Sequence, residues 1–221
     1  MLNWLYRHPH KSDMDWIIRQ LDLQPHQHLL EVGCGSGRLL ADVAHQLNNS
    51  FLAGIEPSVD LYRQACRRNR RLIQQETVQL HLGQSYDLPY PAAYFHTIYG
   101  SGRYYSWKNF VTECLRLTSL LRAGGRLLLL SEPGRYRNED DLRTEAARLQ
   151  SAFLKAGLTG IHTEFRHLPP GASVAVTGFK KDIHIDSEYL TPINKRLLNP
   201  EAYFISNVAR MQISKLSHPS T

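Results

Sequence analysis

Short apolar runs and longer amphipathic stretches alternate along most of this chain. Runs of strand length lie at residues 29–32, 51–55, 78–82, 95–99 and 126–130. Stretches with apolar residues at helical spacing lie at residues 12–21, 39–47, 61–72, 110–121 and 140–156. Strands that alternate with helices are typical of a parallel sheet covered by helices on both faces.

The pattern changes after the last of these helices. Residues 161–168 and 173–179 are predicted to be two strands joined by Pro169-Pro170-Gly171, which indicates an antiparallel hairpin. We therefore expect an α/β fold, with a doubly wound, Rossmann-like and mostly parallel seven-stranded sheet that ends in a C-terminal antiparallel hairpin.

A glycine-rich loop, Gly33-Cys34-Gly35-Ser36-Gly37, joins the first strand to the helix that follows it. Glycine permits positive φ angles and lets a ligand approach the bare backbone. The following helix directs its free N–H groups toward any anion at the loop. A dinucleotide fingerprint needs a third glycine at the sixth position, where this chain has Arg38. The loop is instead Gly-x-Gly-x-Gly, preceded by the carboxylate of Glu31.

That pattern resembles motif I of the class I S-adenosylmethionine-dependent methyltransferases, and three further landmarks follow in the family's order. Gly54-Ile55-Glu56-Pro57-Ser58 is similar to the end of the family's second strand. Residues 83–91 resemble its Gly-Asp-Ala-x-x-Leu-Pro-Phe stretch, and residues 121–126 resemble its Leu-Lys-Pro-Gly-Gly-Arg turn. The resemblance covers residues 25–180 and implies S-adenosylmethionine as the cofactor.

The resemblance also implies roles for individual residues. Glu56 should hold the ribose hydroxyls, and it lies nineteen residues after Gly37, close to where a doubly wound sheet presents such an acid. Gln84 stands where the family usually has an aspartate that accepts from the adenine amino group, and an amide oxygen accepts the same bond without the charge. The complete expected cofactor-binding set is Glu31, Gly33, Cys34, Gly35, Gly37, Glu56, Pro57, Gln84, Ser85 and Gly100.

Methyl transfer from a sulfonium is a direct displacement that needs neither a metal nor an enzyme nucleophile. Holding the reactants in line can lower the barrier by roughly 7–11 kcal/mol, so we assign no catalytic residue. If the acceptor needs deprotonating, Tyr104, Glu132 and His10 are the candidates. His96 replaces the family's usual aspartate, and we expect a packed or hydrogen-bonded strand histidine there. His8-Pro9-His10 has no nearby carboxylate or cysteine set, and we expect no metal.

Charge and composition narrow the remaining classes. The net charge is +6, and Arg63, Arg67, Arg68, Arg70 and Arg71 gather in one predicted helix. A solvated helix face is the plain interpretation, and a patch for RNA or another anionic partner is the alternative. No apolar run is long enough to span a bilayer, the N-terminus lacks an apolar signal region, and the three cysteines form no Cys-x-x-Cys pair. We expect a cytoplasmic protein without a membrane partner.

The leading hypothesis is a methyltransferase that acts on a small molecule, similar to the broad ubiquinone-biosynthesis-like group. The alternatives are an RNA or protein methyltransferase recruited through the arginine cluster, and a non-catalytic scaffold with the same fold. In such enzymes the segment before motif I often covers the substrate. We therefore expect an N-terminal helical lid at residues 1–24, a methyltransferase domain at 25–180, and an extension at 181–221. The extension's predicted helix, starting at Asn199-Pro200-Glu201, is the candidate for a homodimer contact.

Overall fold

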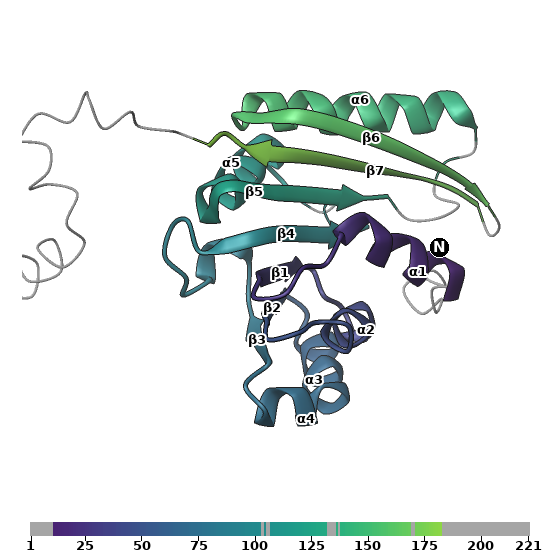
Figure 1. Ribbon diagram of the computed structural model, residues 1–221. Coiled ribbons are helices and arrows are strands. Elements are labelled where there is room, and N and C mark those ends of the chain that lie inside the picture. The colour runs from purple at the N-terminus through teal and green to yellow at the C-terminus, as the bar shows by residue number, and fades with distance from the viewer. Residues whose placement is uncertain are drawn as a thin grey trace, which may run out of the picture. The chain divides into compact units, whose positions relative to one another are not determined.

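A seven-stranded sheet organises the chain in the computed structural model, which describes residues 11–102, 104, 107–131, 136, 138–168 and 171–182 (Figure 1). Its strands are β1 (His28–Val32), β2 (Phe51–Glu56), β3 (Val78–Leu82), β4 (Phe95–Ser101), β5 (Leu121–Leu130), β6 (Leu158–Leu168) and β7 (Gly171–Lys180). The strand order is β3-β2-β1-β4-β5-β7-β6. Because β7 pairs antiparallel with both β5 and β6, the other six strands run in one direction. The predicted fold class is confirmed.

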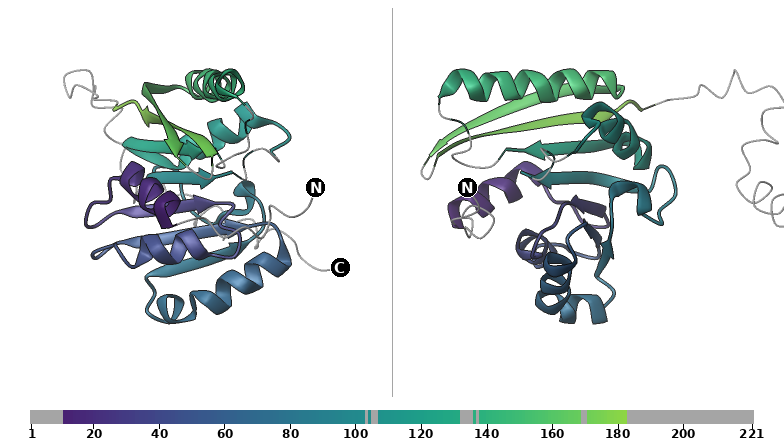
Figure 2. Two further views of the ribbon diagram at one scale, coloured as in Figure 1. Left: turned by 90° about the vertical axis from the view of Figure 1, so that its right-hand side faces the viewer. Right: turned by 180° about the vertical axis from the view of Figure 1, so that it is seen from behind.

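Helices cover both faces of this sheet, as the two views in Figure 2 show. They are α1 (Lys11–Leu21), α2 (Arg38–Ala44), α3 (Val59–Arg68), α4 (Arg70–Gln74), α5 (Phe110–Leu120) and α6 (Glu139–Lys155), with a short 3₁₀ turn, η1 (Ser85–Asp87). Apolar side chains of α1 and α2 pack on one face of the sheet, and those of α5 and α6 pack on the other. The predicted C-terminal helix lies outside the described residues.

The helix predicted over residues 61–72 is two helices, with Asn69 at the break. The Asn69 side chain is 1% exposed. Its Nδ2 donates to the carbonyl oxygens of Ala65 at 2.9 Å and Gly37 at 3.0 Å. Asparagine side chains that bind nearby backbone groups compete with helical hydrogen bonding. The single-helix prediction was therefore wrong, because apolar spacing does not show where an asparagine turns inward.

The fifth strand also begins earlier than the predicted 126–130. It starts at Leu121 and passes through Gly124 and Gly125 before reaching the apolar run. Pairing with β4 shifts at this point, since Phe95 lies opposite Leu121 whereas Thr97 lies opposite Arg126. The glycines therefore lie in a bulge within the strand, and the turn predicted there is part of the sheet.

Helix α1 runs along one face of the sheet, antiparallel to β5. At its carboxyl end, Arg126 Nη2 from the middle of β5 donates to the carbonyl oxygen of Asp22 at 3.0 Å. Closer to its amino end, Trp16 Nε1 donates to Glu164 Oε1 at 2.9 Å. Through β7, Glu164 is level with Leu130, the last residue of β5. The residues of α1 before Trp16 therefore extend past the carboxyl ends of β4 and β5 (Figure 1).

Candidate active site

The glycine-rich loop leaves the carboxyl end of β1 and enters α2, as predicted. Gly33, Gly35 and Gly37 have φ angles of 72°, 57° and 70°, which side chains rarely tolerate. The amides of Gly33 and Cys34 donate to the carbonyl oxygen of Ile55 at 2.9 and 3.1 Å. The loop is therefore fixed against the end of β2. Its three glycines place no side chain of their own over the backbone.

The last glycine of the loop serves helix packing. A Cβ atom on Gly37 would lie 2.5 Å from Asn69 Nδ2 and 2.9 Å from Ala65 Cβ. The neighbouring Arg68 Nη1 donates to Ser36, at 2.7 Å to its carbonyl oxygen and 2.8 Å to its hydroxyl. The end of α3 thus holds the second half of the loop, a role that the sequence did not indicate for Arg68 or Asn69.

Glu56 ends β2 directly beside the loop. Its Oε2 accepts from the amide of Gly35 at 2.8 Å, and its Oε1 accepts from the amide of Ser58 at 3.0 Å. The side chain is 0% exposed, so a ligand reaches it only when neighbouring groups move. Pro57, the next predicted residue, is exposed.

Glu31 lies one strand away from Glu56, near the carboxyl end of β1, and is 3% exposed. The Tyr99 hydroxyl, on the adjacent strand β4, donates to Glu31 Oε2 at 3.1 Å. Burial raises the pKa of Glu31 to about 8, and the hydrogen bond from Tyr99 opposes that rise. The site therefore holds one carboxyl group that is largely protonated at neutral pH.

Tyr99 was not among the predicted site residues. A tyrosine in an apolar strand usually indicates core packing, and Tyr99 is indeed 0% exposed. The available signal was the position of its strand, because β1 and β4 are neighbours at the switch point of a doubly wound sheet. A polar atom late in β4 can then reach the acid late in β1.

The end of β3 brings the predicted adenine-binding residues beside Glu56. The amide of Gly83 donates to the carbonyl oxygen of Glu56 at 3.2 Å. The exposed Gln84 follows, and its amide donates to Asp87 Oδ2 at 2.8 Å. The hydroxyl of Ser85 donates to the carboxylate of Glu113, and this hydrogen bond attaches η1 to α5. The loops after β1, β2 and β3 therefore converge at one edge of the sheet.

Residues late in β4 are packed tightly. A Cβ on Gly100 would lie 3.2 Å from the carbonyl oxygen of Val32, so this glycine permits close approach of β4 to β1. Tyr104 is 1% exposed, with its ring centroid 6.2 Å from that of Trp107 and 5.8 Å from that of Phe110. This burial favours core packing for Tyr104 over a role as a base. The other candidate bases, Glu132 and His10, lie outside the described residues.

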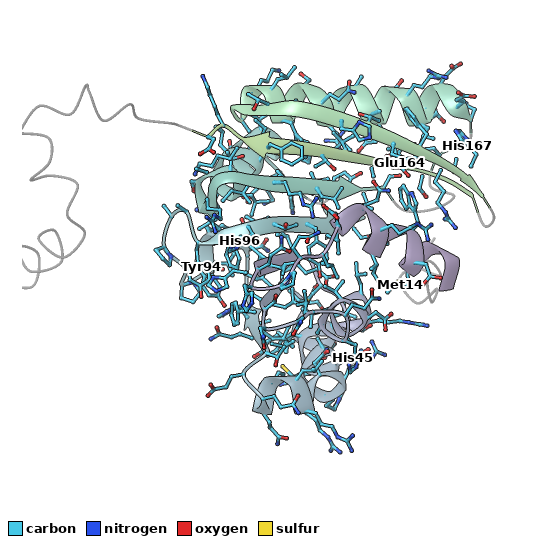
Figure 3. All side chains as sticks on the ribbon, viewed as in Figure 1. Met14, His45, Tyr94, His96, Glu164 and His167 are labelled. Carbon is cyan, nitrogen blue, oxygen red and sulfur yellow. The ribbon has the colours of Figure 1, made fainter. Side chains whose placement is uncertain are left out.

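His96 lies far from this edge, near the start of β4. Figure 3 shows His96 and Tyr94 at the opposite end of the sheet from Met14. The Nδ1 atom of His96 accepts from the amide of His28 at 3.0 Å. Burial and the nearby Arg122 guanidinium lower the pKa of His96. The prediction of a hydrogen-bonded strand histidine is confirmed.

Within the described part of the chain, no group of three or more His, Cys, Asp or Glu side chains is arranged to hold a metal ion. No helix among these residues has the length and apolar character needed to cross a membrane.

Comparison with known proteins agrees with this geometry. Residues 29–125, which include the loop and all the converging strand ends, match the family model of the methyltransferase domain. An uncharacterised methyltransferase of Bacillus subtilis strain 168, YdaC, is 24% identical over 166 residues, which cover 75% of this chain and 90% of that protein.

Solved structures share the fold at low identity. Phosphoethanolamine N-methyltransferase 2 of Haemonchus contortus, in complex with phosphomonomethylethanolamine and S-adenosylhomocysteine, superimposes with a TM-score of 0.64 at 11% identity, covering 80% of this chain and 56% of that one. The [4+2]-cyclase SpnF superimposes with a TM-score of 0.64 at 18% identity, covering 77% of this chain and 80% of that one.

The fold, the loop and the family match together identify the chain as a class I S-adenosylmethionine-dependent methyltransferase. It is an enzyme, and S-adenosylmethionine is its cofactor. The donor set fits this cofactor, because the loop presents bare backbone and two buried carboxyl groups, Glu31 and Glu56, stand beside it. A cationic ligand with a sugar diol is complementary to such groups.

Proposed function

We propose that this enzyme methylates a small-molecule acceptor. The observation that carries the proposal is the placement of α1, whose amino end extends past the carboxyl ends of β4 and β5 and is tied to β6 by Trp16 and Glu164. A helix across this edge narrows the approach to the cofactor loop. A narrowed site favours a small acceptor over a folded macromolecule.

The proposed roles of the residues follow from their chemistry. Glu56 accepts from the ribose hydroxyls, the loop from Gly33 to Gly37 approaches the amino-acid end of the cofactor, and Gln84 accepts from the adenine amino group. The bound cofactor supplies a methyl group on a sulfonium, which a nucleophilic atom of the acceptor can displace. Positioning of the acceptor in line then provides most of the rate enhancement. Of the lid predicted at residues 1–24, residues 1–10 lie outside the described residues, and α1 is the described part that we propose to lie over the acceptor.

One solved structural neighbour, the Haemonchus contortus N-methyltransferase, is in complex with a small molecule, phosphomonomethylethanolamine. This supports the acceptor class without identifying the molecule. The structure of the cyclase SpnF shows that the same fold also serves other reactions, so transfer has to be measured directly.

The direct test is a metabolite screen with methyl-labelled S-adenosylmethionine, with total RNA and total protein as parallel substrates at moderate salt. We expect label in the low-molecular-mass fraction. Reactions with the Gly35→Val variant provide the background. Label that enters only RNA or only protein contradicts the small-molecule proposal.

A second candidate, an RNA methyltransferase, is favoured by one specific observation. Four exposed arginines on α3 and α4 form what we call the arginine face: Arg63, Arg67, Arg70 and Arg71. Among the described residues, none of the four makes an ion pair or a side-chain hydrogen bond. By contrast, Arg143 and Arg148 on α6 pair with Glu139 and Glu145. The arginine face also adjoins Arg68, which contacts the cofactor loop.

The double variant Arg67→Glu with Arg70→Glu tests this candidate. If the arginine face binds RNA, the variant should bind a single-stranded RNA at least about tenfold more weakly at 50 mM salt, and the salt dependence of binding should become shallower. The single variants Arg67→Glu and Arg143→Glu form the matched comparison, because each reverses one charge, the first on the arginine face and the second on α6. Equal RNA binding by these variants and the native protein would show that the arginine face is solvated surface.

A further inference from the structure

We propose that cofactor binding releases a proton from Glu31, and that Tyr99 is a positioning residue that sets how strongly the two events are coupled. The inference rests on the proposed cofactor-binding role of Glu31 and is independent of the acceptor. It concerns the pair formed by Glu31 and Tyr99, which the sheet holds between the cofactor loop and the apolar core.

The register of the sheet creates the pair. In β1, Glu31 lies opposite Gly54 of β2 on one side and opposite Tyr99 of β4 on the other. Gly54 offers no side chain, and a Cβ there would already lie 2.5 Å from Leu40 Cδ1. In the described part of the chain, the Tyr99 hydroxyl is therefore the one hydrogen-bond donor to the Glu31 carboxyl group, at 3.1 Å.

The other ionisable groups that face this pair are acidic. Glu56 at the end of β2 and Asp42 on α2 both oppose ionisation of Glu31 through their negative charge. Cys34 in the loop faces the tyrosine and acts on it in the same sense. With burial added, these neighbours keep Glu31 protonated near neutral pH, and the Tyr99 hydroxyl is the group that favours its carboxylate.

The cofactor brings the positive charge that this site lacks. The amino-acid end of S-adenosylmethionine or S-adenosylhomocysteine carries an ammonium group, and the former adds a sulfonium. A cation within about 4–6 Å of a carboxyl group lowers its pKa by about 1–3 units. Binding therefore favours the ionised form of Glu31, and the proton leaves to solvent.

The sign of the pH dependence follows from linkage. The protein without ligand holds the proton up to pH 8 or so, whereas the complex does not, so raising the pH strengthens binding. Apparent affinity scales with the ionised fraction, which grows nearly tenfold from pH 6 to pH 7. The ligand's own ammonium, with a pKa of about 7.7–8.0, keeps its charge over that interval.

The test is calorimetric titration with S-adenosylhomocysteine at pH 6 and pH 7. For the native protein we expect a rise in affinity of about five- to eightfold, which corresponds to a pKa of Glu31 lowered by about two to three units, together with release of about half to one proton, measured in two buffers of different ionisation enthalpy. The Glu31→Gln variant should show less than about a twofold change. 5′-Methylthioadenosine lacks the ammonium group, so its affinity should not depend on pH in the native protein.

Tyr99→Phe separates positioning from packing, since it removes the hydroxyl and keeps the ring. Loss of the hydrogen bond raises the pKa of Glu31 further, so affinity at pH 7 should fall by about three- to tenfold. It should recover as the pH rises, whereas a packing defect would weaken binding equally at every pH.

Affinity that does not change between pH 6 and pH 7 in the native protein overturns the inference and leaves the cofactor assignment intact. A pH dependence that persists in Glu31→Gln assigns the proton elsewhere and also overturns it. Absence of binding at every pH overturns both the inference and the cofactor site. If Glu31→Gln does not fold, the proton release of the native protein and the pH profile of Tyr99→Phe decide the matter.

Discussion

Replacement of Gly35 by valine is expected to lower the affinity for S-adenosylhomocysteine by at least about 100-fold. Gly35 has a φ of 57°, and its amide donates to Glu56 at 2.8 Å. A branched side chain is strained in that conformation and would stand where the ligand must approach the backbone. Titration calorimetry measures the affinity, and circular dichroism checks that the sheet is retained.

Gly157→Val is the matched control for this substitution. Gly157 also has a positive φ, 79°, but it follows α6, and a Cβ there would have open space within 4 Å. The backbone strain is similar and the site is distant, so Gly157→Val should lower the melting temperature and keep the affinity within about twofold. If Gly35→Val also retained native affinity, the loop would not be the cofactor contact.

Glu56→Gln is expected to weaken S-adenosylhomocysteine binding by about ten- to 150-fold, or about 1.5–3 kcal/mol. Glutamine has nearly the same shape but accepts at one oxygen only. Its NH₂ group would face the amide of either Gly35 or Ser58, both of which now donate to the carboxylate. One donor would lose its partner, and the acceptor proposed for the ribose would lose its charge.

Asp60→Asn provides the control for charge. Asp60 lies in the first turn of α3, four residues after Glu56, and is exposed. The variant removes the same charge from the same region without changing the loop, so its affinity should stay within about twofold of the native protein, as expected for a screened surface charge. Equal weakening by both variants would indicate a general electrostatic effect and would remove the specific role of Glu56.

Local signals in the sequence predicted much of this fold and site. The strand, glycine loop and helix around Gly35 could be predicted because glycines at alternate positions after an apolar run permit few other structures. Glu56 could be located because it ends the second apolar run, nineteen residues after Gly37, in a stretch that resembles the end of the family's second strand. The hairpin of β6 and β7 followed from two apolar runs on either side of a Pro-Pro-Gly turn.

The features that the sequence did not reveal depend on contacts between distant residues. The hydrogen bond between Tyr99 and Glu31 joins residues that are 68 positions apart, and it exists because β4 pairs with β1 in one particular register. Asn69 contacts Gly37 across 32 positions. Neither partner carries a local signal, since a tyrosine in a strand and an asparagine in a helix have ordinary local explanations.

Two hydrogen bonds attach α1 at different places along its length. In the middle of β5, the largely buried Arg126 side chain donates to the carbonyl oxygen of Asp22, just after the carboxyl end of α1. Nearer the amino end of α1, the indole N–H of Trp16 donates to the carboxylate of Glu164 in a part-buried hydrogen bond. The Trp16 ring is also covered by Arg166 of β6, whose guanidinium carbon lies 5.8 Å from the ring centroid. Because Met14, Trp16 and Ile17 are each at most 6% exposed and belong to the apolar cluster on this face of the sheet, moving α1 would expose that cluster to water as well as break the hydrogen bond of Trp16.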